Sequence, residues 1–295
     1  MKKPPRATHI AVLLSTVQLS WLTAVAALAL AWSPNAHGQA VKLDFTNVTT
    51  AADGYDSEYG HGPSHSSSVI YFTNVATVGG TSIDMRATAT ILDKNYAFEG
   101  HFANYSQSSS QLSGDLGSKY TANALGIGRL QYELDFYVGG GTFTTPYAIS
   151  EFDLLVYDVD GEERYSKVEQ SESLSAYTPD GLYCYRLADN INSVKASPIS
   201  DGIRFDGPGY NLSSTDTTAA VLLTYKNSSH VKLVFESNTF SGTVPNPVFQ
   251  AIDGDSSMLK GDYSSFDTPV IVPEPSAAAL LAVTGLFTLG RRRRV

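Results

Sequence analysis

One stretch of this chain gathers carboxylates at a spacing that would hold a hard metal ion. Asp158 and Asp160 follow an apolar run, and Gly161 and Glu163 come directly after them. Alternate side chains of an extended backbone point to the same side, so the two aspartates can converge, and a glycine permits a sharp turn that brings a further carboxylate round. Clustered oxygen ligands on a loop suit Ca²⁺, which tolerates irregular geometry. The spacing therefore predicts a calcium site formed by Asp158, Asp160 and Glu163.

The same residues have a simpler interpretation as a turn. Aspartate side chains accept hydrogen bonds from nearby backbone amides, and Asp-Val-Asp-Gly is a sequence that forms such turns. The spacing of an EF-hand is absent, because no third Asp or Asn stands two residues after Asp160. The sequence leaves both interpretations open.

Other residues with metal-binding side chains are scattered. His61 and His65 lie close together, but the Gly-Pro between them predicts a loop, and the sequence offers no third ligand for zinc. A second acidic turn, residues 251–257, has the same ambiguity as the first. His101 and His230 are isolated in the sequence.

The sequence contains no recognisable catalytic constellation. Its single cysteine, Cys184, excludes an internal disulfide and lies in an alternating segment that predicts a buried structural thiol. A nucleophile elbow, a P-loop and a dinucleotide-binding glycine motif are all absent. We therefore expect a non-catalytic protein. The alternative is a secreted glycoside hydrolase or lyase, since two carboxylates roughly 5 to 10 Å apart would suffice and sequence cannot pair them across strands.

Alternation of apolar and polar residues with a period of two dominates the chain between its ends. In Thr81–Leu92, Ile83, Met85 and Ala87 would share one face. Such segments are rich in β-branched and aromatic residues and are separated by Gly, Ser, Asn, Asp and Pro. Because no helical periodicity intervenes, we predict one all-β domain, an antiparallel β-sandwich of jelly-roll-like topology over residues 39–263. The expected strands are Val41–Phe45, Val69–Asn74, Thr81–Leu92, Leu130–Val138, Phe152–Tyr157, Tyr183–Leu187, Gly202–Phe205, Ala219–Tyr225 and Val231–Glu236.

The C-terminal segment, residues 273–295, combines three features in a fixed order. A Pro-Glu-Pro motif comes first, an uncharged apolar run over residues 276–289 follows, and a cluster of arginines ends the segment. The run is shorter than the roughly 20 residues that a comfortable transmembrane helix needs. Arginines stay on the cytoplasmic side of a membrane, which places the Pro-Glu-Pro end outside. The residues concerned are Val272, Pro273, Glu274 and Pro275, and Arg291, Arg292, Arg293 and Arg294.

This arrangement resembles the PEP-CTERM sorting signal of exported bacterial proteins. The resemblance implies recognition by a membrane-embedded exosortase, cleavage near Pro-Glu-Pro, and release or transfer to the cell surface, often alongside exopolysaccharide production. It also implies that the apolar run is a transmembrane sorting helix that anchors the chain in the membrane until it is processed. The alternative is an ordinary tail anchor.

The N-terminal segment has the features of a secretory signal peptide. A basic head is followed by an apolar body that includes residues 21–32, and Ala36-His37-Gly38 forms a small-residue exit. We predict a signal helix over residues 1–38 that signal peptidase removes after Gly38 or, alternatively, after Ala40. An uncleaved N-terminal anchor is the other option.

The body that remains between these two signals is acidic. Residues 39–272 hold 13 Lys and Arg and 28 Asp and Glu, because seven basic residues and Glu274 lie outside this range. The net charge of the body is therefore about −15. Such a charge disfavours nucleic acid as a partner, because phosphate contacts need Lys and Arg. We expect an exported protein of the cell surface or extracellular matrix, associated with glycan or exopolysaccharide, whose residues 264–272 form a short stalk before the sorting tail.

Overall fold

The computed structural model describes one compact unit of the chain, which begins at Ala40. The predicted signal peptide, and the part of the predicted sorting tail beyond residue 273, lie outside the described residues. No helix among the residues described is both long and apolar enough to span a membrane. The described ranges are 40–51, 67–93, 96–98, 116–122, 125–164, 167–189, 193–212, 216–240, 247–254 and 266–273.

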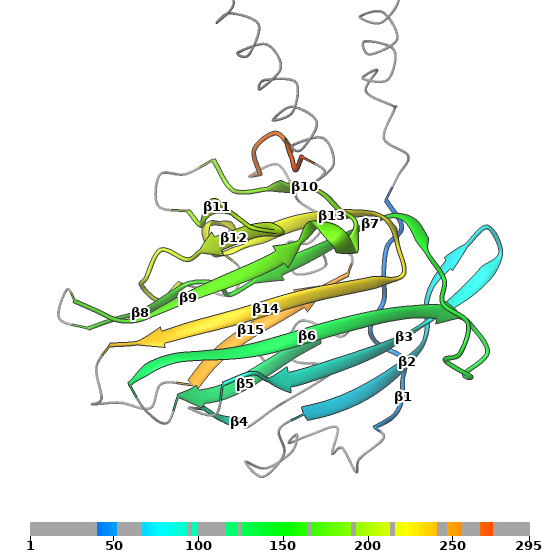
Figure 1. Ribbon diagram of the computed structural model, residues 1–295, viewed down its shortest axis with the longest axis horizontal. Helices are drawn as coiled ribbons and strands as arrows, with labels where there is room; N and C mark the ends of the chain where they lie inside the picture. Colours follow the sequence, from blue (N-terminus) through cyan, green and yellow to red (C-terminus); the bar gives the residue numbers. More distant parts are fainter. Residues whose placement is uncertain are drawn as a thin grey trace, which may run out of the picture. The chain divides into compact units, whose positions relative to one another are not determined.

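Two antiparallel sheets form the fold, which confirms the predicted all-β sandwich (Figure 1). The helical turns of the described residues are two short 3₁₀ segments, Thr178–Asp180 and Thr217–Ala219. The jelly-roll-like strand order stays a prediction. The larger sheet has the order β1 (Val48–Ala51), β2 (Ser67–Val78), β3 (Thr81–Ile91), β6 (Gly126–Val138), β14 (His230–Thr239), β9 (Lys167–Tyr177), β12 (Gly202–Asp206) and β11 (Lys195–Ile199), with β8 (Gly161–Arg164) also paired to β9. The smaller sheet has the order β16 (Val270–Ile271), β10 (Leu182–Arg186), β13 (Val221–Ser228), β7 (Ile149–Tyr157), β15 (Pro247–Asp253), β5 (Leu116–Ala122) and β4 (Tyr96–Phe98).

The core lies between the inner faces of the two sheets. Residues that alternate along β3, including Ile83, Met85 and Ala87, are fully buried, as their period of two predicts. Phe136 of the larger sheet and Phe152 of the smaller sheet meet edge to face, with ring centroids 5.1 Å apart. One continuous apolar cluster therefore joins the sheets and fixes which face of each strand is left for solvent.

Two boundaries differ from the sequence expectation. Val41–Phe45 makes an isolated bridge at Val41 rather than a strand, although Leu43 and Phe45 are buried in the core. The predicted stalk is also wrong over its described part. Residues 266–272 pack on the smaller sheet, where β16 pairs with β10 and the amide of Val272 donates to the carbonyl of Tyr183 at 2.9 Å. Apolar side chains explain this, because Phe266 and Val272 are buried.

Candidate functional site

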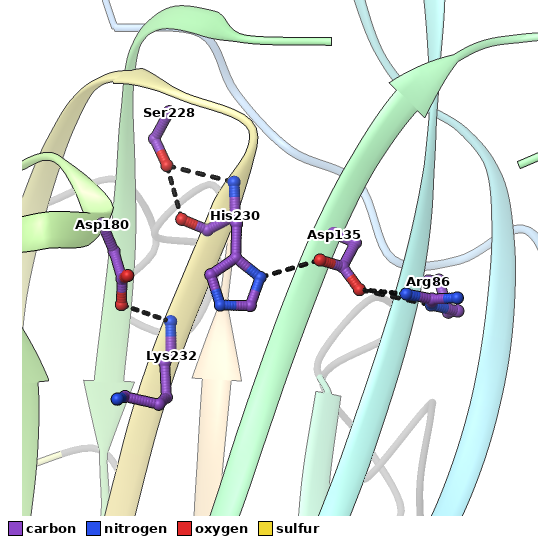
Figure 2. A network of polar contacts seen from close by, with 6 residues as sticks. All are labelled: Arg86, Asp135, Asp180, Ser228, His230 and Lys232. Atoms are coloured by element: carbon purple, nitrogen blue, oxygen red, sulfur yellow. Dashed lines mark hydrogen bonds and ion pairs between the residues drawn. The ribbon is translucent and has the colours of Figure 1, made fainter. Parts of the chain in front are cut away.

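A straight row of polar side chains crosses the outer face of the larger sheet. Tyr71 of β2 is the register partner of Arg86 of β3, Arg86 is the partner of Asp135 of β6, and Asp135 is the partner of His230 of β14. The neighbours of these residues along each strand point into the core, so the alternation of the pleat places the four side chains together on the outside. Figure 2 shows the three charged members in line on neighbouring strands.

Asp135 connects the other two charged groups of the row. One carboxylate oxygen lies 2.7 Å from Nδ1 of His230, and the other accepts from Nη2 and Nε of Arg86 at 2.6 and 3.2 Å. The side chains of Arg86 and His230 are 38% and 39% exposed, whereas that of Asp135 is 20% exposed. The row therefore presents a half-buried carboxylate between two cations that solvent can reach.

These contacts shift the pKa values of Arg86, Asp135 and His230. The hydrogen bond to Asp135 raises the pKa of His230, against the opposing effect of burial. Burial alone would raise the pKa of Asp135, but the hydrogen bonds from His230 and Arg86 outweigh it and the pKa is lowered. The hydrogen bond to Asp135 also raises the pKa of Arg86. The ion pairs are thus maintained together over a wide pH range.

The pair of His230 and Asp135 resembles the base and orienting acid of a catalytic triad, but Ser228 is turned away from it. The hydroxyl of Ser228 donates to the backbone carbonyl of His230 at 2.6 Å and accepts from its amide at 3.2 Å. A nucleophile would have to meet the imidazole nitrogen that does not contact the carboxylate. Ser228 is engaged with the backbone of His230 instead.

The predicted calcium ligands are not brought together. Asp158 and Asp160 are buried after β7, whereas Glu163 is exposed on β8. The two oxygens of Asp160 accept from the backbone amides of Gly161 and Leu212. Across the described part of the chain, no three His, Cys, Asp or Glu side chains form a group that could hold a metal ion. The backbone at these residues has the geometry of the turn, and the calcium site stays a prediction.

The geometry of this turn explains its residue types. Asp158 has a φ of 65°, a left-handed conformation that aspartate tolerates better than most residues. Gly161 has a φ of 137°, and a Cβ added there would lie 2.5 Å from the carbonyl oxygen of Gln170. The backbone path that links β7 to β8 thus requires glycine at position 161 and suits aspartate at position 158.

A buried carboxyl cluster, which the sequence did not reveal, surrounds this turn. Glu172 of β9 points inward, and its carboxyl group accepts a hydrogen bond from the side-chain amide of Gln250 of β15 at 3.3 Å. This contact links the two sheets. Burial raises the pKa of Glu172 well above its ordinary value, and the nearby charges of Asp160 and Asp158 raise it further. Burial also raises the pKa of Asp160 to about 6, although the amides of Leu212 and Gly161 oppose the shift. The cluster is shielded from solvent, and Asp160 and Glu172 keep their protons to a higher pH than ordinary carboxyl groups do.

The remaining candidates are distributed as follows. Asp253 of the second acidic turn is buried at the end of β15, and Cys184 is buried in β10 as expected of a structural thiol. Val272 is buried and Pro273 is exposed immediately after it. The candidates outside the described residues are His61, His65, His101, Asp255, Glu274, Pro275, Arg291, Arg292, Arg293 and Arg294.

The comparisons with known proteins leave the family open. No protein-family model matches the chain, and no curated protein matches it. Among solved structures, the chain is similar to the N-terminal domain of the Streptococcus gordonii adhesin Sgo0707, with 13% identity and a TM-score of 0.43. This match covers 73% of the chain and 63% of the adhesin domain. The chain is also similar to the adhesin domain of PrgB from Enterococcus faecalis, solved bound to DNA, with 14% identity and a TM-score of 0.40. This match covers 64% of the chain and 67% of the PrgB domain. The chain thus spans less than two thirds of the length of the first of these, and similarities this distant do not bear on what it binds.

Proposed function

We propose that this chain is an exported bacterial surface or matrix protein that an exosortase processes at its C-terminus. The proposal rests on the order of motifs in residues 272–295, which resembles the PEP-CTERM sorting signal. Its N-terminal counterpart is the basic and apolar segment before Gly38, which signal peptidase would remove. The apolar run would hold the precursor in the membrane until cleavage.

The observation that carries this proposal is the position of the Pro-Glu-Pro motif directly after a strand of the described domain. Strand β16 ends at Ile271, Val272 is 6% exposed, and Pro273 is exposed. A sorting signal is a disposable address, so it is expected to begin where the mature domain stops. In this chain the motif begins two residues after β16.

Intact-mass analysis of protein recovered from the cell surface tests the proposal. The expected mass corresponds to a chain that begins near Gln39 or Val41 and ends close to Pro273. A variant with Pro273→Ala and Pro275→Ala provides the control, because it should retain the tail and stay in the membrane fraction. Recovery of surface protein that still carries Arg291–Arg294 would contradict the proposal.

At the surface, we propose a non-catalytic role in association with glycan or exopolysaccharide. The row from Tyr71 to His230 supports this role, because it offers hydrogen-bond donors, acceptors and an aromatic ring on a rigid sheet. The acidic composition of the body argues against nucleic acid. Tyrosine, with 17 residues in the chain, provides further rings that can stack on sugars.

A secreted glycoside hydrolase or lyase remains the alternative. Its favouring observation is the pair Asp160 and Glu172, two neighbouring carboxyls with raised pKa values, which is a common feature of catalytic acids. Both are nearly covered, at 5% and 6% exposure, so a sugar could reach them only if the sheets separated. Release of reducing sugar from polysaccharide by the native chain, lost in Glu172→Gln, would favour the enzyme over the binding protein.

A further inference from the structure

An aromatic cluster lies beside the polar row on the outer face of the larger sheet. Phe143 belongs to the connection between β6 and β7, and its ring centroid lies 4.7 Å from that of Tyr71 and 5.9 Å from that of Tyr137. Tyr137 is buried, whereas Tyr71 and Phe143 are partly exposed. Two rings are therefore accessible from solvent, and the third supports them from below.

A buried carboxylate holds the connection that carries Phe143. Asp84 is 1% exposed and accepts from the amides of Gly140 and Gly141 at 3.0 and 2.7 Å. It also accepts from the amide of Asn74 at 2.9 Å, within the bulge of β2 where three residues stand opposite Asp84. The Asp84 side chain thus holds both the connection between β6 and β7 and the bulge of β2. The aromatic cluster is therefore preorganised before any ligand arrives.

The backbone at Phe143 has an unusual conformation. Its φ is 49°, a left-handed conformation that bulky residues rarely adopt and that glycine or asparagine would adopt more easily. Strained residues of this kind concentrate where the chain presents a side chain for a purpose. The connection between β6 and β7 thus places the ring of Phe143 against that of Tyr71.

The groups next to these rings favour an uncharged partner with hydroxyl groups. The guanidinium of Arg86 lies 5.6 Å from the ring centroid of Tyr137 and pairs with Asp135, which also pairs with His230. Both Arg86 and His230 are paired with Asp135, so neither cation of the row is left without a counter-charge. A sugar hydroxyl both donates and accepts, and the row offers donors on Arg86 and His230 beside the acceptor Asp135.

We propose that the Tyr71–Phe143 pair and the adjoining row of Arg86, Asp135 and His230 bind a sugar unit of a neutral polysaccharide. A ring of the sugar stacks on the exposed aromatic surface, and its hydroxyl groups bond to the row. The net charge of the body, about −15, disfavours acidic polysaccharides by long-range repulsion. This inference rests on the proposed glycan association and names its ligand class and its residues.

Affinity electrophoresis of the full-length chain tests the proposal. Native gels contain dextran, hydroxyethyl cellulose or soluble starch as neutral probes, and alginate as the acidic comparison. We expect retardation by at least one neutral polymer and a smaller effect of alginate. Tyr71→Ala and Phe143→Gly should each weaken the interaction about tenfold, the size expected when one stacked ring is lost. Glycine suits the left-handed backbone at position 143, so the second variant removes the ring without unfolding the loop.

Tyr183→Ala is the matched control. Tyr183 is a partly exposed tyrosine on the other sheet, with Lys226 Nζ 3.6 Å from its ring centroid, and its loss should leave retardation unchanged. Three results overturn the proposal: no retardation by any neutral polymer, equal retardation of Phe143→Gly and the unmodified chain, or stronger retardation by alginate. Binding is measured on the unprocessed chain, so its failure would leave C-terminal processing to be judged by intact mass alone.

Discussion

Asp160→Asn should make the stability of this protein less dependent on pH. The carboxyl of Asp160 has a pKa of about 6 in the folded state against 3.8 ordinarily, because it is buried. The folded state therefore keeps a proton that the unfolded chain releases, and the unfolding free energy falls as pH rises from about 4 to 6. A pKa difference of about two units corresponds to about 3 kcal/mol. For a domain of this size, that is a decrease in Tm of about 6 to 12 °C.

The substitution has two opposing effects. Asparagine does not ionise, so the loss of about 3 kcal/mol with rising pH disappears. It also offers one acceptor where Asp160 uses two, and one of the amides of Gly161 and Leu212 loses its partner at a cost of about 1 to 2 kcal/mol. The variant should be less stable than the unmodified chain at pH 4 and more stable at pH 8, so the two stability curves cross.

Thermal unfolding of the purified full-length chain from pH 4 to pH 8, followed by circular dichroism, measures both curves. Glu163→Gln is the control, because Glu163 is an exposed carboxylate of the adjacent strand β8 and its curve should run parallel to that of the unmodified chain. If the Asp160→Asn curve also ran parallel, the carboxyl would be ionised in the folded state and the reasoning from burial would be refuted.

Three further changes have defined outcomes. His230 has a raised pKa, so its contribution to stability is complete below about pH 6.5 and is lost as the pH rises through the pKa of the folded state. Asp135→Asn should remove this pH dependence and return the pKa of His230 toward 6.5. NMR titration of the histidine measures this pKa. Asp84→Ala leaves three backbone amides without their acceptor and should cost about 3 kcal/mol or more in denaturant unfolding, while the conservative Asp84→Asn costs less. Phe152→Ala removes a fully buried ring that joins the two sheets, and a loss of about 3 to 5 kcal/mol is expected; a cost below 1 kcal/mol would show that the sheets are not held together there.

Two strands that sequence alone predicted, Thr81–Leu92 and Val231–Glu236, carry an alternating apolar pattern. Their alternate apolar residues, Ile83, Met85, Ala87, Val231, Leu233 and Phe235, are buried, and these side chains made the inner face visible in the sequence. Lys167–Tyr177 was missed although it lies between β14 and β12 in the larger sheet. Its inward residues include Gln170 and Glu172, whose burial depends on partners from β14 and β15. A pattern of hydrophobicity does not detect a polar residue that a distant strand satisfies.

The candidate site shows the same division. The sequence determined the types of residue and offered the turn at Asp158–Gly161 as one of two interpretations, because a turn depends on neighbours along the chain. The signals proposed at the two ends rest on the sequence alone. In the row from Tyr71 to His230, the contact between Asp135 and His230 joins residues that are 95 positions apart in the sequence. The row exists because four strands pair in one register. A shift of one residue in any strand would turn its member of the row into the core. Long-range pairing is decided by the packing of the whole sandwich, so only the tertiary structure could place His230, which is isolated in the sequence, beside its carboxylate.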